Sequence, residues 1–236
     1  MFMRGQKYLF YPIFSLLLTA FFTIFSTTAR SQNLKFGLKG SPSIVWMKPD
    51  YQGWEASGLR TGFGFGLVTD FGLSDHYFIS TGVEIAHRGG NLSQRIDSIA
   101  YHYKEDFKYK LQYLDIPVTL KLKTNKIGYF SYFGQFGVTG QILLKARADR
   151  SGGTLNNLPL PVLKDVNYSS MIIPVGMDMT IGAGIEYEFA GSTALLAGLT
   201  FHNGFTDLLK NSTGNTGELR YRATCNTVVL NIGILF

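Results

Sequence analysis

The sequence of 236 residues carries 22 lysine and arginine residues against 16 aspartate and glutamate residues, a formal net charge of +6. It contains no basic run with interleaved aromatic side chains, so the charge does not indicate nucleic-acid binding. A single cysteine, Cys225, excludes an internal disulfide, and its place in an alternating segment favours a packing role.

Residues 1–31 have the features of a secretory signal peptide. Two basic residues precede an apolar stretch from about residue 8 to residue 25, and the small residues Ala29 and Ser31 follow. We expect cleavage near Ser31, with cleavage after Ala29 as the competing choice. The alternative is an uncleaved anchor, but the apolar stretch is shorter than the roughly 20 residues that span a bilayer. Cleavage leaves one domain, 32–236, with 19 basic and 16 acidic residues and a charge of +3.

Eight segments of this domain alternate between apolar and polar residues. The expected strands are 34–47, 57–72, 76–90, 107–123, 128–146, 173–190, 193–206 and 219–236. The connections between them are alternately long and tight. The tight ones lie near 73–75, 124–126 and 191–192, and the long ones near 48–56, 91–106, 147–172 and 207–218. This pattern predicts an all-β fold, an eight-stranded antiparallel transmembrane β-barrel with short periplasmic turns and longer extracellular loops.

One face of each strand is apolar and should meet lipid, as with Phe63, Phe65 and Leu67 in the second strand. The opposite faces should point into the lumen. They carry charges that we expect to form a structural ionic network: Arg60, Glu84, Arg88, Asp115, Lys121, Asp178 and Glu186. An eight-stranded barrel has room inside only for side chains, and an unpaired buried charge is costly, so these groups should pair. A soluble sandwich with reversed faces is the alternative fold, and a catalytic or ion-conducting cluster is the alternative role.

The last strand ends with Val228, Leu230, Ile232, Ile234 and Phe236 on one apolar face. It resembles the C-terminal signal by which bacterial outer-membrane barrels are handed to the barrel assembly machinery. We therefore expect Phe236 to act as an assembly signal, and the protein to lie in contact with lipid in the outer membrane of a Gram-negative bacterium.

The segment Tyr113–Lys123, YLDIPVTLKLK, resembles the YLEIPLLLKY strand of PorT-like outer-membrane β-barrel proteins, and residues 36–40 and 133–137 look similar too. The resemblance implies an eight-stranded barrel of the outer membrane. Founding members of that family serve type IX secretion and gliding motility, but no motif marks this chain as the dedicated secretion member. Within the segment, Pro117 lacks a backbone donor and predicts a bulge or a gap in strand pairing.

Other motifs point away from catalysis. The alternating glycines of Gly62–Gly66 are superficially similar to a phosphate-binding loop, but no helix follows them, and we expect them to relieve crowding in a narrow lumen. No two of the four histidines have metal-ligand spacing on one strand. His87 and His202 lie toward the outer rim, where a lipid-modifying hydrolase would place its site, but neither has a nucleophile beside it. We expect no enzyme activity, cofactor or metal.

The expected function is a structural, anchoring or partner-binding role, with a protein partner contacting loops 91–106 and 147–172. The segment from Ser151 to Ser170 is rich in leucine, and exposed apolar loops usually contact another surface. The same loop could instead cover the barrel mouth as a lid. Two alternative functions are an accessory component of a type IX-like protein secretion system and a small-solute porin, the latter favoured by ten or more strands.

Overall fold

The computed structural model describes residues 34–50, 54–97, 102–191, 193–209, 212–214, 217–219 and 223–236. The chain divides into two units, Met1–Asn33 and Leu34–Phe236. The expected signal peptide lies in the first unit, outside the described residues. No helix in the described part of the chain is both long and apolar enough to cross a membrane.

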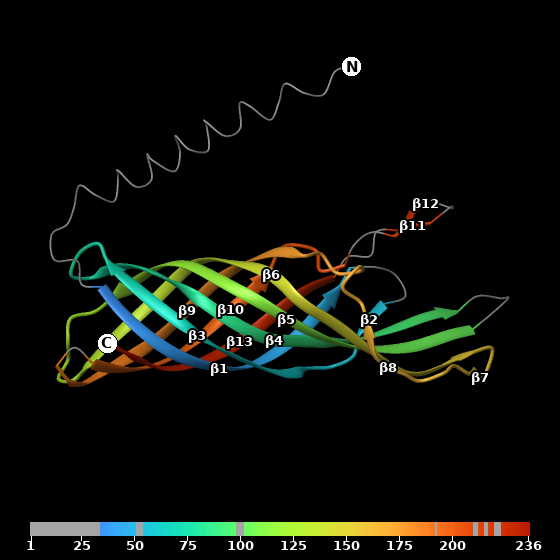
Figure 1. The fold of residues 1–236 in the computed structure, drawn as a ribbon, viewed down its shortest axis with the longest axis horizontal. Helices are drawn as coiled ribbons and strands as arrows, with labels where there is room; N and C mark the ends of the chain where they lie inside the picture. Colours follow the sequence, from blue (N-terminus) through green and yellow to red (C-terminus); the bar gives the residue numbers. More distant parts are fainter. Residues whose placement is uncertain are drawn as a thin grey trace, which may run out of the picture. The chain divides into compact units, whose positions relative to one another are not determined.

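Eight long strands of the second unit form a closed antiparallel β-barrel (Figure 1). They are β1 (Leu34–Pro49), β3 (Arg60–Gly72), β4 (Tyr77–Asp97), β5 (His102–Lys123), β6 (Phe130–Leu155), β9 (Val175–Ala190), β10 (Thr193–Gly204) and β13 (Ala223–Leu235). Each strand pairs with the next, and β13 pairs with β1 to close the barrel. The expected fold class is confirmed. The short strands are β2 (Trp54–Ala56), β7 (Leu158–Pro159), β8 (Leu163–Asn167), β11 (Ser212–Gly214) and β12 (Gly217–Leu219).

The two ends of the barrel differ in their connections. The start of β1 and the C-terminus lie at one end, where Phe36 and Phe236 exchange backbone hydrogen bonds of 3.1 and 2.6 Å. The tight β3–β4, β5–β6 and β9–β10 connections lie at that same end (Figure 1). Because short turns face the periplasm in outer-membrane barrels, we call it the periplasmic end and the opposite one the extracellular end.

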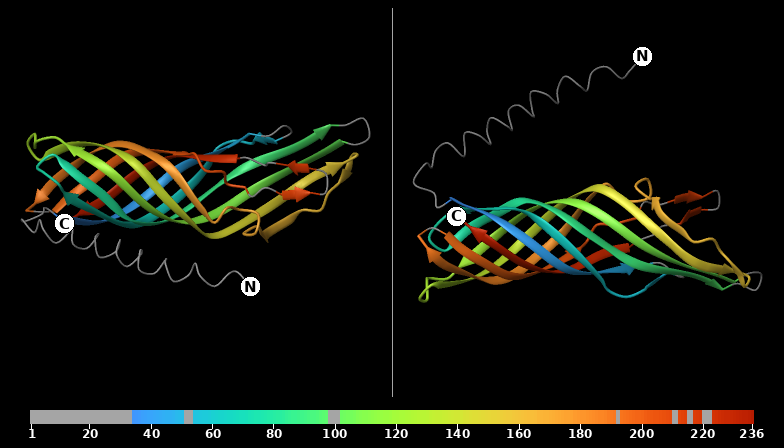
Figure 2. Two further views of the ribbon diagram at one scale, coloured as in Figure 1. Left: turned by 90° about the horizontal axis from the view of Figure 1, so that it is seen from above. Right: turned by 60° about the horizontal axis from the view of Figure 1, so that its bottom comes forward.

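At the extracellular end, β4, β5 and β6 continue beyond the barrel (Figure 2). β3 stops pairing with β4 at His87, whereas the β4–β5 ladder runs on to Asp97 and His102. The β5–β6 ladder runs equally far, to Leu155. We call the parts of β4, β5 and β6 beyond His87, Gln112 and Lys145 the extension.

The expectation that 91–106 and 147–172 are mainly long loops is therefore wrong. Much of both ranges lies in the ladders of the extension. Alternation continues there, with Glu105, Phe107 and Tyr109 turned inward and buried. The outward residues are polar or charged instead of apolar, as with Asn91, Lys108 and Arg147, so the extension lacks the hydrophobic face that marks the other strands.

The outer faces of the barrel are apolar, which excludes the soluble sandwich. Large apolar side chains remain exposed around the wall, among them Phe63 at 51%, Leu67 at 57% and Ile181 at 54%. At the periplasmic end, Leu235 is fully buried in an internal cluster with Phe133 and two residues of β10. Successive residues of a strand point to opposite sides of the barrel wall, so each strand has one outer face and one inner face.

Pro117 interrupts pairing on one side of β5, as expected. The β4–β5 ladder passes from Thr81↔Val118 to Glu84↔Asp115 without intervening pairs, whereas pairing with β6 continues. The Thr81 hydroxyl donates a 2.8 Å hydrogen bond to the Pro117 carbonyl across the gap. A side chain thus replaces part of the ladder that proline cannot complete.

Candidate functional site

The lumen holds its charged residues in compact networks. Toward the periplasmic end, Lys121 Nζ lies 2.6 Å from Asp70 Oδ2 and 2.5 Å from Glu186 Oε1. The other oxygen of Glu186 lies 2.6 Å from Lys123 Nζ. Lys121 also sits 4.5 Å from the centre of the Phe133 ring, within range of a cation–π interaction. Each buried charge here therefore has an opposite partner.

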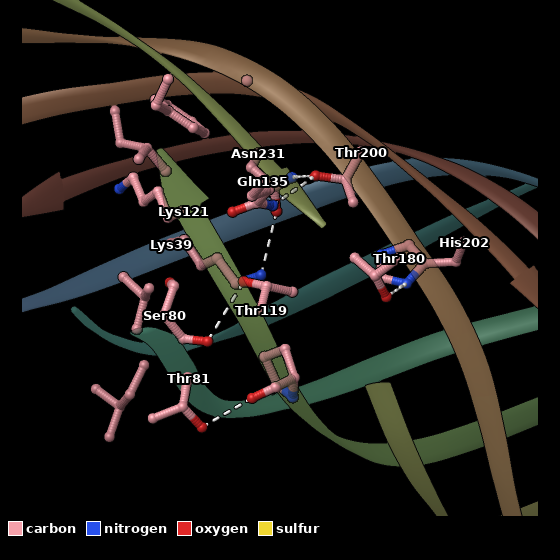
Figure 3. Close-up of a pocket in the computed structure, with 16 residues that line it drawn as sticks. Lys39, Ser80, Thr81, Thr119, Lys121, Gln135, Thr180, Thr200, His202 and Asn231 are labelled. Carbon is pink, nitrogen blue, oxygen red and sulfur yellow. Dashed lines mark hydrogen bonds between the residues drawn. The ribbon is translucent and has the colours of Figure 1, made fainter. Parts of the chain in front are cut away.

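A second group occupies the middle of the lumen (Figure 3). Lys39 Nζ lies 2.5 Å from Glu84 Oε2. Lys39 also donates a 3.1 Å hydrogen bond to Asn231, which Figure 3 shows. The Asn231 amide donates in turn to the Thr200 hydroxyl, at 2.8 Å. Lys39 was missed at the sequence level, although Lys35, Lys39 and Ser41 alternate with apolar residues along β1.

A third group lies nearer the extracellular end, where Arg88 forms ion pairs with Asp115 and, at 3.3 Å, with Asp178. The Gln141 amide also donates to Asp178. Arg88 is 7% exposed and both carboxylate residues are 3% exposed, so solvent contributes little to their stability. One cation thus serves two buried carboxylates.

Six of the seven expected network residues are accordingly in the lumen and paired, and Arg60 is elsewhere. Arg60 lies beyond the point where β3 stops pairing with β4. The Arg60 guanidinium donates a hydrogen bond to the Tyr109 carbonyl. An added Cβ on Gly89 would lie 3.0 Å from Arg60 Nη1. Arg88 points into the lumen, so its neighbour Gly89 lies on the outer face of β4. Arg60, which lies beside Gly89, therefore reaches across that outer face.

The space left in the lumen is small. A cavity of about 50 Å³ lies among the polar side chains of Figure 3. Because one water needs roughly 10–15 Å³ of such cavity volume, this cavity suits a few water molecules. The lumen is filled by its own side chains.

The two rim histidines do not form a shared site. His87 is exposed on the outer face, whereas His202 lines the internal cavity, its Nδ1 3.2 Å from the Thr180 hydroxyl. That hydroxyl–imidazole pair borders only the small cavity, so a substrate has no room beside it. Within the described ranges, no group of three or more His, Cys, Asp or Glu side chains could hold a metal ion.

An apolar cluster closes the extracellular mouth. Met47, Leu92 and Leu111 pack from the strands, while Ile172 and Leu208 enter from the connections after β8 and β10. The two connections are joined by a backbone bridge and a 2.9 Å hydrogen bond from Ile173 to Leu208. The lid comes from these residues and not from the leucine-rich part of 151–170.

The inner face of the extension has a buried ion pair of its own. Glu105 is 1% exposed and accepts bonds of 2.6 and 2.8 Å from the guanidinium of Arg150. The Tyr103 hydroxyl also donates to Glu105, and burial together with this carboxylate raises the pKa of Tyr103 to about 12. Sequence reasoning missed this pair because it placed these residues in loops.

Comparisons with known proteins give one family match and several solved structures of low similarity. The sequence profile of the outer membrane protein beta-barrel domain matches residues 28–210. Neisserial surface protein A is 8% identical with a TM-score of 0.44, over 85% of this chain and 95% of that one. OprG from Pseudomonas aeruginosa is 15% identical with a TM-score of 0.45, over 86% of this chain and 95% of that one. Ail from Yersinia pestis is 14% identical with a TM-score of 0.34, over 86% and 98%.

The comparison with curated proteins finds no match. The family match covers most of the sequence, and its domain is the same kind of barrel that the strands form. The chain belongs to the family of outer-membrane proteins that carry the outer membrane protein beta-barrel domain.

Proposed function

We propose that this protein is a non-conducting and non-catalytic barrel that anchors its extension at the outer membrane and presents it to a protein partner. The observation that carries the proposal is the contrast between the filled interior and the exposed apolar tip. The cavity among the polar side chains of the lumen measures only about 50 Å³, whereas apolar side chains stand exposed at the tip of the extension. A filled barrel with an apolar outer tip suits binding better than transport.

The exposed tip lies at the end of β6 and in the connection that follows. Its members, which we call the apolar tip, are Leu155, Leu158, Val162 and Leu163, with exposures of 41, 70, 57 and 40%. They lie beyond the rows that meet lipid, so the membrane does not account for them. Several large apolar side chains exposed to water in one short stretch of chain favour an interaction site.

A role in a type IX-like secretion system is the second candidate. The segment Tyr113–Lys123, with its resemblance to PorT-like proteins, favours it. The leader, with cleavage near Ser31, belongs to the same proposal, because either role needs export. The porin alternative is disfavoured by the eight strands and the filled lumen.

Conductance tests the first half of the proposal. The protein purified from outer membranes is inserted in a planar lipid bilayer, and we expect no stable single-channel steps. An established porin in the same bilayer is the positive control. Steady steps that depend on protein concentration would contradict the filled lumen.

Photo-crosslinking tests the second half. A photoreactive amino acid replaces Leu158 in living cells, and Glu55, also exposed at the extracellular end, is replaced as the matched control. We expect one discrete crosslinked protein at position 158 that is absent at position 55. Identical patterns at the two positions, or no crosslinked protein at all, would count against a partner at the apolar tip.

A further inference from the structure

The outer wall changes from apolar to polar along one row of paired residues. The last apolar row across β4, β5 and β6 is Ile85, Leu114 and Ile142, which lie opposite one another in the ladders. The next outward row is His87, Gln112 and Lys145. In a membrane protein this transition marks the level where acyl chains give way to headgroups.

A β-bulge sharpens this boundary on β6. Pairing shifts from Tyr113↔Leu143 to Gln112↔Lys145, which leaves Leu144 as the extra residue. Leu144 is 50% exposed, and the exposed Lys145 follows it on the same outer face. Bulges redirect side chains, and here one places an apolar residue and a cation next to each other.

Cations gather directly above that boundary. Lys110 and Arg147 face each other across the β5–β6 ladder, and the third member of their row is Gly89. Because Gly89 has no side chain, the guanidinium of Arg60 fits over it. We call the outward cations Arg60, Lys108, Lys110, Lys145 and Arg147 the basic face.

The acidic residues nearby compensate only part of this charge. Asp149 lies 2.7 Å from Lys110 Nζ, and that hydrogen bond lowers the pKa of the Asp149 carboxyl. Asp165 pairs with Arg147. Asp106 shares the outer face of β5 with Lys108 and Lys110, so five cations face three carboxylates and positive charge remains in excess. A groove of about 510 Å³ runs among Arg60, Lys110, Lys145 and Arg147 and is bordered below by Phe63.

We infer that the basic face binds the phosphate groups of an outer-leaflet lipid whose acyl chains lie along the apolar rows below it. Excess positive charge and guanidinium forks suit phosphate oxygens. The groove meets Phe63 at its lower edge, and the exposed Leu144 precedes Lys145 of its lining, so a ligand held there by phosphate finds apolar surface for its chains. A soluble anion would gain nothing from that edge. This site is separate from the apolar tip, and either could exist without the other.

Lipid binding by the purified full-length outer-membrane form tests the inference. The protein in neutral detergent is titrated with lipid A that carries two phosphates, and bound lipid is counted by native mass spectrometry. We compare Lys110→Gln/Arg147→Gln with the control Lys48→Gln/Lys126→Gln, which removes the same charge from β1 and from a periplasmic turn. Heat-modifiable gel mobility verifies that each variant is folded.

We expect the Lys110/Arg147 variant to bind at least about tenfold more weakly and the control to bind within about twofold of the wild type. Lipid A without phosphate should bind as weakly as the variant does, and added salt should weaken wild-type binding. The charge-keeping exchange Lys110→Arg/Arg147→Lys should restore most of the affinity.

Three results would overturn the inference. Equal weakening in the variant and the control would show only general electrostatic attraction. Equal binding of phosphorylated and unphosphorylated lipid A would show that the protein does not recognise the phosphate groups. Displacement of the lipid by inorganic phosphate at the lipid's own concentration would identify a free-anion site instead of a lipid site.

Discussion

Arg88 is the only cation in direct ion-pair contact with Asp115 and Asp178 among the described residues. All three are nearly inaccessible to water. Burying charges is unfavourable unless each has a partner, so removing the shared partner costs more than removing one of the two carboxylates. These three charged side chains therefore depend on one another for their stability in the lumen.

We therefore predict that Arg88→Met lowers the free energy of unfolding by about 3–5 kcal/mol, because two buried carboxylates lose their partner. Asp115→Asn should lower it by less, since Arg88 keeps Asp178. The exposed pair of Lys126 provides the control, and Lys126→Met should change stability by no more than about 1 kcal/mol. Denaturant unfolding in detergent micelles measures all three. Similar losses for Arg88 and Lys126 would refute this view of the lumen.

Glycines on the inner face of β3 let its neighbour approach closely. A Cβ on Gly66 would lie 2.6 Å from the Cα of Glu84 and would also strike the Val83 carbonyl. Backbone cannot move aside as a flexible side chain can. Gly40, on the outer face of β1, has room, because the nearest atom to its added Cβ is 3.9 Å away.

At the level of the strand we predict that Gly66→Ala lowers the free energy of unfolding by about 1–3 kcal/mol through overpacking. Gly40→Ala should leave it unchanged or slightly raised, since alanine also restricts the unfolded chain. Equilibrium unfolding of the two variants under one condition decides the matter. A loss at Gly40 equal to that at Gly66 would mean that glycine serves some purpose other than close approach.

The last strand carries two neighbouring residues with opposite environments. Phe236 is 53% exposed on the outer face, and Leu235 is fully buried inside. A signal read by assembly machinery must be accessible, whereas an internal side chain acts through packing. The two functions of this strand should therefore be separable.

Deleting Phe236 is predicted to reduce insertion into the outer membrane while export to the periplasm continues. Phe236→Ala tests the ring alone, because it keeps the backbone bonds to Phe36. Leu235→Ala should insert nearly normally and lower the free energy of unfolding by about 2–5 kcal/mol through the cavity it leaves. Quantitative recovery from outer membranes, followed by unfolding of the recovered protein, separates the effects. Full recovery of the deletion variant would dismiss Phe236 as a signal.

For the whole molecule, a barrel with an apolar exterior must reach the outer membrane after export. We predict that the mature protein begins at Gln32 and migrates on gels with heat-modifiable mobility. N-terminal sequencing of protein from isolated outer membranes checks the cleavage point. An intact leader on the membrane-inserted protein would support the uncleaved anchor.

Much of the barrel was predictable because alternation is a local property of an extended chain. All eight strands and their lipid-facing sides follow from it, and Pro117 marks its own gap because it lacks a donor. The extension was not predicted, since charged outward residues hide its alternation. Arg60 was misplaced because β3 no longer pairs with β4 at that point, and the long side chain reaches the outer face of β4 beside Gly89.

The sequence by itself determined the number of strands, their faces and the end of the barrel at which the tight turns lie, because side-chain direction repeats every two residues. Only the tertiary structure decided which charges meet. Pairs such as Lys39 with Glu84, or Lys110 with Arg147 across a ladder, depend on the register between strands and on closure of β13 against β1. Register is set by contacts along whole strands and around the barrel, and no single segment contains that information.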